Sequence, residues 1–124
     1  MKFYNKNIGN YGEDLSVKYL SNLGYKILNR NFRCKLGEID IISMLESDNR
    51  ICFTEVKSRY NSLYGFPFEA ITYRKIKRIK AAAKFYIMVN NLKNLDFRFD
   101  VIEVVFNNSN DSYCLNLIEN AFWV

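Results

Sequence analysis

Residues 37–57 read GEIDIISMLESDNRICFTEVK and contain two runs that are rich in β-branched and aromatic residues. The runs extend from Gly37 to Met44 and from Ile51 to Lys57, with the polar residues 46–49 between them. Two such runs on either side of a short polar link predict a β-hairpin. Because the runs are nearly continuous in apolar residues, we expect both strands to be buried on both faces.

The register of this hairpin follows from a loop centred in the polar link. Ile42 then pairs with Phe53. Two residues away from the loop, Asp40 lies directly opposite Glu55, with the two Cβ atoms roughly 4.5 to 5.5 Å apart. Lys57 shares the face of Glu55, because side chains alternate along a strand.

Two opposed carboxylates repel each other, and burying either one is costly unless a cation compensates its charge. Carboxylate oxygens, a backbone carbonyl and water are ligands that suit a hard ion such as Mg²⁺ or Mn²⁺. Asp40 and Glu55 are therefore predicted to hold a divalent metal. Lys57 provides a positively charged donor beside them.

The same residues carry a family resemblance. Asp40 followed by Glu55-x-Lys57 resembles the core of the PD-(D/E)xK nuclease superfamily, with Ile39 in the place of the proline. More narrowly, nearly the whole chain resembles the uncharacterised bacterial YraN-like family, which is similar to archaeal Holliday-junction resolvases. The other matching segments are Gly12-Glu13, Gly24-Tyr25, Asn29-Arg30-Asn31, residues 65–70 (GFPFEA), residues 98–102 (RFDVI) and residues 120–122 (NAF).

Composition limits the class of protein. With 124 residues, of which 49% are hydrophobic and 25% charged, the chain is expected to form one domain over residues 1–124. A formal net charge of +5 favours an anionic partner, and nucleic acid is the leading candidate. The sequence has no recognisable signal peptide or membrane span, so we expect a cytoplasmic location.

The residue types narrow the chemistry further. The chain has no His, which excludes Ser-His and Cys-His nucleophiles and His-based metal sites. Cys34, Cys52 and Cys114 are odd in number and widely spaced, which favours reduced thiols over a disulfide framework or a zinc cluster. Acid–base chemistry must therefore use carboxylates, Lys, Tyr or metal-bound water.

Residues 7–23 predict an amphipathic helix that Gly24 closes. Glu13 lies at the margin of its apolar stripe, which consists of Ile8, Tyr11, Leu15, Tyr19, Leu20 and Leu23. By position alone Glu13 is a rim carboxylate favoured by the positive end of the helix. The family resemblance implies instead that Glu13 points at the metal site as an auxiliary acidic residue.

For several residues next to the hairpin the sequence leaves two alternative roles. Residues 26–33 predict a strand that flanks the hairpin. Glu38 either joins the metal shell or neutralises Lys57, and we slightly favour the ion pair. Residues 58–69 predict a loop in which Arg59 and Tyr60 contact nucleic acid, or in which the aromatic side chains pack into the core.

Residues 72–90 predict a second helix with Thr72 as its N-cap. Its polar face is basic without any acidic residue, and consists of Arg74, Lys75, Lys77, Arg78, Lys80 and Lys84. An ordinary solvated helix mixes charges of both signs to form i,i+4 pairs. We therefore expect Arg74, Lys75, Lys77 and Arg78 to follow a phosphate backbone; the alternative is a face that serves solubility alone.

Two further strands are predicted, at residues 95–106 and, on an edge, at residues 113–118. Arg98 and Asp100 share one face and are expected to form a structural salt bridge rather than to support the metal site. The tail, residues 119–124, packs on the core or on a second subunit. The resulting order, α-β-β-β-α-β-β, predicts an α/β fold with a mixed, restriction-endonuclease-like sheet flanked by helices.

The motif and the resemblance together imply a Mg²⁺- or Mn²⁺-dependent endonuclease that hydrolyses DNA phosphodiesters. Asp40, Glu55, the Val56 carbonyl and Glu13 would hold the ion, and Lys57 would orient the attacking water or stabilise the charged phosphorane. The similarity to junction resolvases implies branched DNA as substrate and a homodimer. The alternatives are a nucleic-acid-binding module without catalysis and an adaptor in DNA processing.

Overall fold

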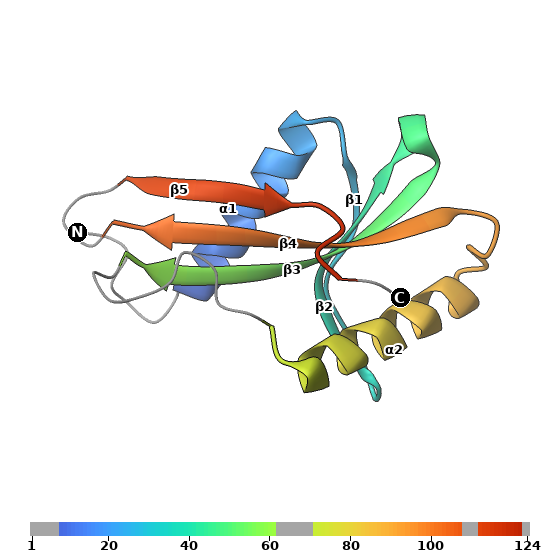
Figure 1. The fold of residues 1–124 in the computed structure, drawn as a ribbon. Helices are drawn as coiled ribbons and strands as arrows, with labels where there is room; N and C mark the ends of the chain where they lie inside the picture. Colours follow the sequence, from blue (N-terminus) through green and yellow to red (C-terminus); the bar gives the residue numbers. More distant parts are fainter. Residues whose placement is uncertain (1–7, 62–70, 108–111, 123–124) are drawn as a thin grey trace.

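The computed structural model describes residues 8–61, 71–107 and 112–122 (Figure 1). Within these residues the helices and strands follow one another in the order expected from the sequence. Their bounds are α1 Ile8–Asn22, β1 Lys26–Cys34, β2 Gly37–Leu45, β3 Arg50–Tyr60, α2 Tyr73–Val89, β4 Asp96–Phe106 and β5 Tyr113–Ile118. A short 3-10 helix, Glu46–Asp48, connects β2 to β3.

The strands form one mixed sheet in the order β1-β2-β3-β4-β5. β2 and β3 are antiparallel, with Ile42 opposite Phe53 and Met44 opposite Ile51, so the predicted hairpin register is confirmed over this part. β3 is parallel to β4, which follows it through α2, and β5 pairs antiparallel at the edge. The predicted mixed sheet flanked by helices is therefore confirmed.

The two helices pack on different apolar clusters of the sheet. The cluster at α2 includes Ile79, Ala83, Tyr86, Phe53 and Phe99. The cluster at α1 includes Leu20, Ile41, Cys52, Ile102 and Phe106. Alternate residues of β3 and β4 supply the two clusters, which explains why these strands read as nearly continuous apolar runs in the sequence.

Two glycines allow the helices to approach the central strands closely. A Cβ atom on Gly12 of α1 would overlap the side chain of Ser58 in β3. A Cβ atom on Gly37 of β2 would lie 2.5 Å from the carbonyl oxygen of Arg78 in α2. At Gly37 the clash is with backbone, so a larger residue would push α2 away, whereas at Gly12 the Ser58 side chain would have to move.

The apolar stripe predicted for α1 is partly wrong. The buried residues of the helix are Gly12, Glu13, Ser16 and Leu20. Tyr11, Tyr19 and Leu23, which the stripe included, are exposed. The close packing of α1 on β3 favours small residues at the contact, so large apolar residues did not mark the buried face correctly.

The predicted loop at residues 58–69 begins too early. β3 continues through Tyr60, and Arg59 and Tyr60 pair with Val105 and Phe106 of β4. Residues 62–69 of the predicted loop lie outside the described residues, as do residues 1–7, 70, 108–111 and 123–124.

The described part of the tail packs on the core. The Phe122 ring stacks on Phe99 with 5.1 Å between the ring centroids, and the Ala121 N–H donates to the Phe99 carbonyl at 2.7 Å. Among the described residues, neither helix combines the length and the apolar character that a membrane crossing requires.

Candidate functional site

The paired part of the hairpin ends just before the predicted acidic pair. The last pair of the ladder is Ile41 with Thr54, and β2 and β3 then diverge (Figure 1). Asp40 therefore does not pair with Glu55 in the ladder, although the predicted register required it. Its Oδ2 atom accepts a hydrogen bond from the backbone N–H of Val56 at 2.8 Å. The main chain of β3 therefore fixes the Asp40 carboxylate.

The carboxylates of Asp40 and Glu55 nevertheless interact. Glu55 is 4% exposed and Asp40 is half-buried. Burial, followed by the charge and hydrogen bond of Glu55, raises the pKa of Asp40 to about 7, although the Val56 N–H and Lys75 act to lower it. The pair is thus a negatively charged site whose compensation by the protein is incomplete.

The ammonium group that contacts this pair belongs to α2. Lys75 Nζ lies 2.5 Å from Oε2 of Glu55. Partial burial lowers the pKa of Lys75, but the contact with Glu55 and the charges of Asp40 and Glu38 outweigh burial, so the pKa is raised. From the sequence, Lys75 was expected on the outer basic face. The missed signal is its spacing, since Lys75 continues the buried stripe of Ile79, Ala82 and Tyr86 by one helical turn.

Lys57 occupies the predicted position on β3, two residues after Glu55, and is half-buried. Its neighbour across the parallel ladder is Glu103 of β4, which is 6% exposed. Sequence reasoning missed Glu103. The signal was a single acidic residue inside the apolar run of β4, where a buried charge requires a partner.

The partner of Glu103 is Arg59, one of the residues predicted to bind nucleic acid. The Nε atom of Arg59 lies 3.4 Å from Oε2 of Glu103. Tyr60, also predicted to bind nucleic acid, packs with its ring centroid 6.4 Å from that of Phe106, in the cluster at α1. The Tyr60 ring thus packs into the core, as in the alternative for the aromatic side chains, and Arg59 forms an ion pair with Glu103. Nucleic-acid binding by these two residues stays a prediction.

Glu13 approaches Asp40 from α1. It is 7% exposed, and its Oε1 atom accepts hydrogen bonds from Asn31 Nδ2 at 2.9 Å and from Arg30 at 3.2 Å. Burial raises its pKa, Arg30 lowers it, and the charge of Asp40 raises it again. Glu13 is therefore a buried carboxylate within electrostatic reach of Asp40, rather than a solvated residue at the rim of the helix.

Glu38 pairs with Arg33 instead of the slightly favoured Lys57. The two residues face each other across the β1–β2 ladder, and Nε of Arg33 lies 3.5 Å from Oε2 of Glu38. The β2–β3 ladder does not reach Glu38, which explains why the predicted partner is not the one used. Glu38 also borders a cavity of about 360 Å³, whose other lining residues are Thr72, Arg74, Lys75, Arg78 and Ile79.

The outer face of α2 keeps the basic character expected from the sequence. Arg74, Lys77 and Arg78 are exposed, and Lys77 Nζ lies 5.5 Å from the centroid of the Tyr73 ring. The predicted N-cap is confirmed, because Oγ1 of Thr72 accepts a hydrogen bond from the Lys75 N–H at 3.2 Å. The cap fixes the first turn of α2, from which Arg74 and Lys75 project in different directions.

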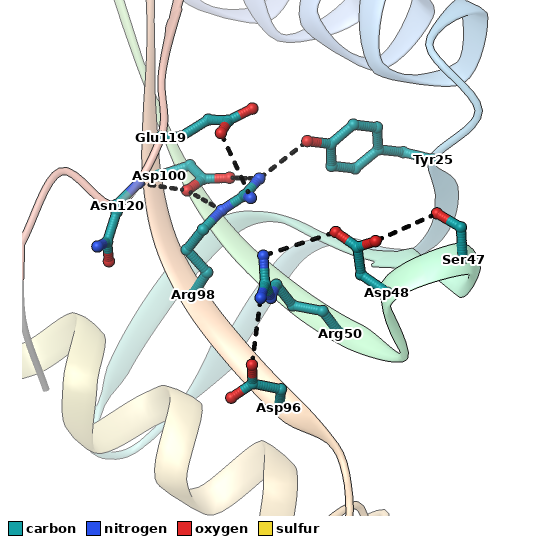
Figure 2. Close-up of polar contacts among 9 residues, drawn as sticks. All are labelled: Tyr25, Ser47, Asp48, Arg50, Asp96, Arg98, Asp100, Glu119 and Asn120. Atoms are coloured by element: carbon teal, nitrogen blue, oxygen red, sulfur yellow. Dashed lines mark hydrogen bonds and ion pairs between the residues drawn. The ribbon is translucent and has the colours of Figure 1, made fainter.

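A further buried acid, Asp100, lies elsewhere on the sheet, with its partners shown in Figure 2. Arg98 binds it through two contacts, at 2.8 and 2.9 Å, and the Asn120 N–H donates to it at 2.9 Å. Arg98 also donates to the Tyr25 hydroxyl at 2.9 Å and lies 3.6 Å from Glu119. The predicted structural salt bridge between Arg98 and Asp100 is confirmed.

The donor set at Asp40 and Glu55 fits a hard divalent cation. No three acidic or Cys side chains among the described residues gather closely enough to hold a metal by themselves. Mg²⁺, however, commonly uses one or two carboxylates and keeps several water ligands. The pKa of Asp40 near 7 supports this fit, because a bound cation would remove the repulsion that raises it.

Comparison with known proteins identifies the family. The profile described as "Uncharacterised protein family UPF0102" matches residues 12–104. A UPF0102 protein of Clostridium novyi is 53% identical over 119 residues, which are 96% of this chain and 98% of the relative. One of Clostridium acetobutylicum is 54% identical over 120 residues, 97% of each chain, and one of Clostridium botulinum is 52% identical over 125 residues, 100% of each. This is the YraN-like family expected from the motifs, and the chain belongs to it.

Proposed function

We propose that the protein is a Mg²⁺- or Mn²⁺-dependent endonuclease that hydrolyses phosphodiesters in DNA. The observation that carries the proposal is the interaction between Asp40 and Glu55, two carboxylates at the point where β2 and β3 separate. Their order with Lys57 resembles the PD-(D/E)xK nuclease core. The basic surface of α2 adds an anion-binding face next to the helix turn that carries Lys75.

Asp40 and Glu55 would hold the ion, with the Val56 carbonyl as a further ligand and Glu13 bound through water or directly. The chemistry supplied by a bound divalent ion is a lower pKa of the attacking water and a polarised phosphoryl oxygen. Lys57, on the face of β3 that carries Glu55, would orient the attacking water and stabilise the charge that develops on the phosphorus oxygens. The Val56 N–H holds Asp40 in a fixed orientation before substrate binds.

The exposed side chains of Arg74, Lys77 and Arg78 would bind the DNA backbone. Contacts to phosphates carry no sequence information, so these residues would position the duplex without selecting a base sequence. Binding through them depends strongly on salt, because each neutralised phosphate releases counter-ions. Branched DNA is the first substrate to test, on the basis of the similarity to junction resolvases, and that similarity also supports a homodimer.

A specific contact favours a second candidate function, a nucleic-acid-binding module without cleavage. Lys75 already provides a positive charge to Glu55 at 2.5 Å. If that charge satisfies the site permanently, no metal enters and the protein binds DNA without hydrolysing it.

Cleavage assays separate the two functions. Four-way junction, flap, single-stranded and linear DNA are incubated with the full chain in Mn²⁺ and in Mg²⁺. We expect cleavage by the wild type and a loss of at least about 100-fold in Asp40→Asn, Glu55→Gln and Lys57→Ala. Asp96→Asn, which changes an exposed acid far from the pair, serves as the matched control. Equal rates in all variants, or DNA binding without cleavage of any substrate, would reject the nuclease.

A further inference from the structure

Lys75 is placed as a counter-ion and not as a surface cation. It contacts a carboxylate that is 4% exposed, although its own side chain is 45% exposed. Glu55 cannot obtain the same charge compensation from water, because it is buried. The contact therefore neutralises one of the two negative charges that Asp40 and Glu55 would carry together.

The position of Lys75 also allows it to leave. The side chain is long, and it borders the cavity of about 360 Å³ that Glu38, Arg74 and Arg78 line as well. The charge of Glu38 already acts on Lys75. A lysine displaced from Glu55 would thus find space and a second carboxylate on the same side of α2.

A divalent cation compensates the pair better than an ammonium does. Two carboxylates beside one ammonium leave a net negative charge, whereas two carboxylates beside a divalent ion leave none. An ion that used Glu55 oxygens as ligands would also compete for the atom, Oε2, that Lys75 contacts. The Lys75 ammonium and a divalent cation would repel each other strongly if both contacted that oxygen.

We infer that Lys75 is a built-in counter-ion of the Asp40–Glu55 site, which a divalent cation must displace from Glu55 in order to bind. This inference rests on the proposed function and deepens it. Lys75 lowers the affinity of the metal-free protein for the ion, and keeps the two carboxylates compensated until the ion arrives. After displacement the ammonium remains near the site, where the phosphate of a substrate is an anionic partner for it.

The test is the affinity of the full chain for Mn²⁺ alone, measured by titration calorimetry without DNA. We expect Lys75→Met to bind Mn²⁺ about three- to tenfold more tightly than the wild type, which is the effect of removing a half-exposed competing cation. Lys75→Arg keeps the positive charge and is expected to show no such gain. Lys84→Met removes the same charge from an exposed position of the same helix and is expected to leave the affinity unchanged.

The outcomes separate this inference from the proposed function. Equal or weaker Mn²⁺ binding by Lys75→Met than by the wild type overturns the displacement but leaves the metal site in place. No Mn²⁺ binding by either protein overturns both. Binding by Lys75→Met alone supports the displacement and favours the non-cleaving module for the wild type. Lys75→Gln repeats the comparison with a polar side chain if circular dichroism shows that Lys75→Met is unfolded.

Discussion

Two acidic clusters of the sheet, one around Asp100 and one around Asp40, combine the same residue types with different results. Asp100 is fully enclosed and receives hydrogen bonds from the Arg98 guanidinium and from the Asn120 backbone (Figure 2). Asp40 faces Glu55 across the point where two strands separate, and one half-exposed lysine contacts the pair. The negative charge of Asp100 is compensated within the protein, so we call the first cluster complete. The second cluster retains negative charge that a bound cation can compensate.

The electrostatic consequences differ in the same way. Burial lowers the pKa of Arg98, but the hydrogen bonds and charge of Asp100 outweigh burial, so the pKa is raised well above its ordinary range. At the other cluster, the charge of Glu55 adds to burial and raises the pKa of Asp40 to about 7. Opposite charges in a favourable geometry stabilise the folded state. Like charges held close together destabilise it, and such pairs with perturbed pKa values are typical of functional sites.

The largest expected effect comes from breaking the complete cluster. Arg98→Met leaves Asp100 buried without its cation, so the free energy of unfolding should fall by about 3–5 kcal/mol. Urea denaturation followed by circular dichroism measures this change. A loss below about 1 kcal/mol would show that the cluster in Figure 2 is not a stabilising unit.

A smaller effect is expected from moving the helix that supplies Lys75. Gly37→Ala places a methyl group against the carbonyl of Arg78, so α2 must shift and the free energy of unfolding should fall by about 1–3 kcal/mol. Because the Lys75–Glu55 contact depends on the position of α2, the variant should also bind Mn²⁺ more tightly than the wild type. Gly9→Ala, where a methyl group meets no atom within 4 Å, is the control.

Asp40→Asn is expected to stabilise the metal-free protein by about 1–2 kcal/mol at pH 8. The folded pKa of Asp40, about 7, lies above the ordinary 3.8, so the folded state binds more protons than the unfolded state between these values. The wild type should therefore lose stability as the pH rises from about 4 to about 7, and Asp40→Asn should lose less. Thermal melts in a chelator across pH 4–8 measure both slopes. Parallel slopes would contradict the shifted pKa.

The smallest effect is expected at Arg50 and its two exposed acidic partners, next to the complete cluster. Arg50 lies 3.3 Å from Asp96 and 3.7 Å from Asp48 (Figure 2), and both acids are largely exposed. Arg50→Met should change the free energy of unfolding by less than about 1 kcal/mol, because solvent screens such pairs. The same urea titration as for Arg98→Met gives the comparison. A loss as large as that of Arg98→Met would mean that burial does not separate the two arginines.

The sequence alone predicted the mixed sheet, which is confirmed, whereas the metal-binding role of the site residues stays a prediction. Period-two and apolar runs identified the strands, the polar link set the hairpin register, and Thr72 marked the start of α2, because these signals act over a few residues. The same local signals placed Asp40, Glu55 and Lys57 near one another. They failed in part for α1, where Gly12, Glu13 and Ser16 are buried beside Leu20, while Tyr11 and Tyr19 remain exposed.

Other features of the site depend on contacts between segments that are distant in the chain. The separation of β2 from β3 lets Asp40 bind the Val56 N–H, and the closeness of α2 to Gly37 lets Lys75 reach Glu55. Arg59 turns to the buried Glu103 for a related reason, since strand pairing carries it onto the sheet. The sequence by itself determined which charges this protein has and in which strands and helices they lie. Only the tertiary structure decided which of them meet, because the pairing of a buried charge depends on how whole helices and strands pack.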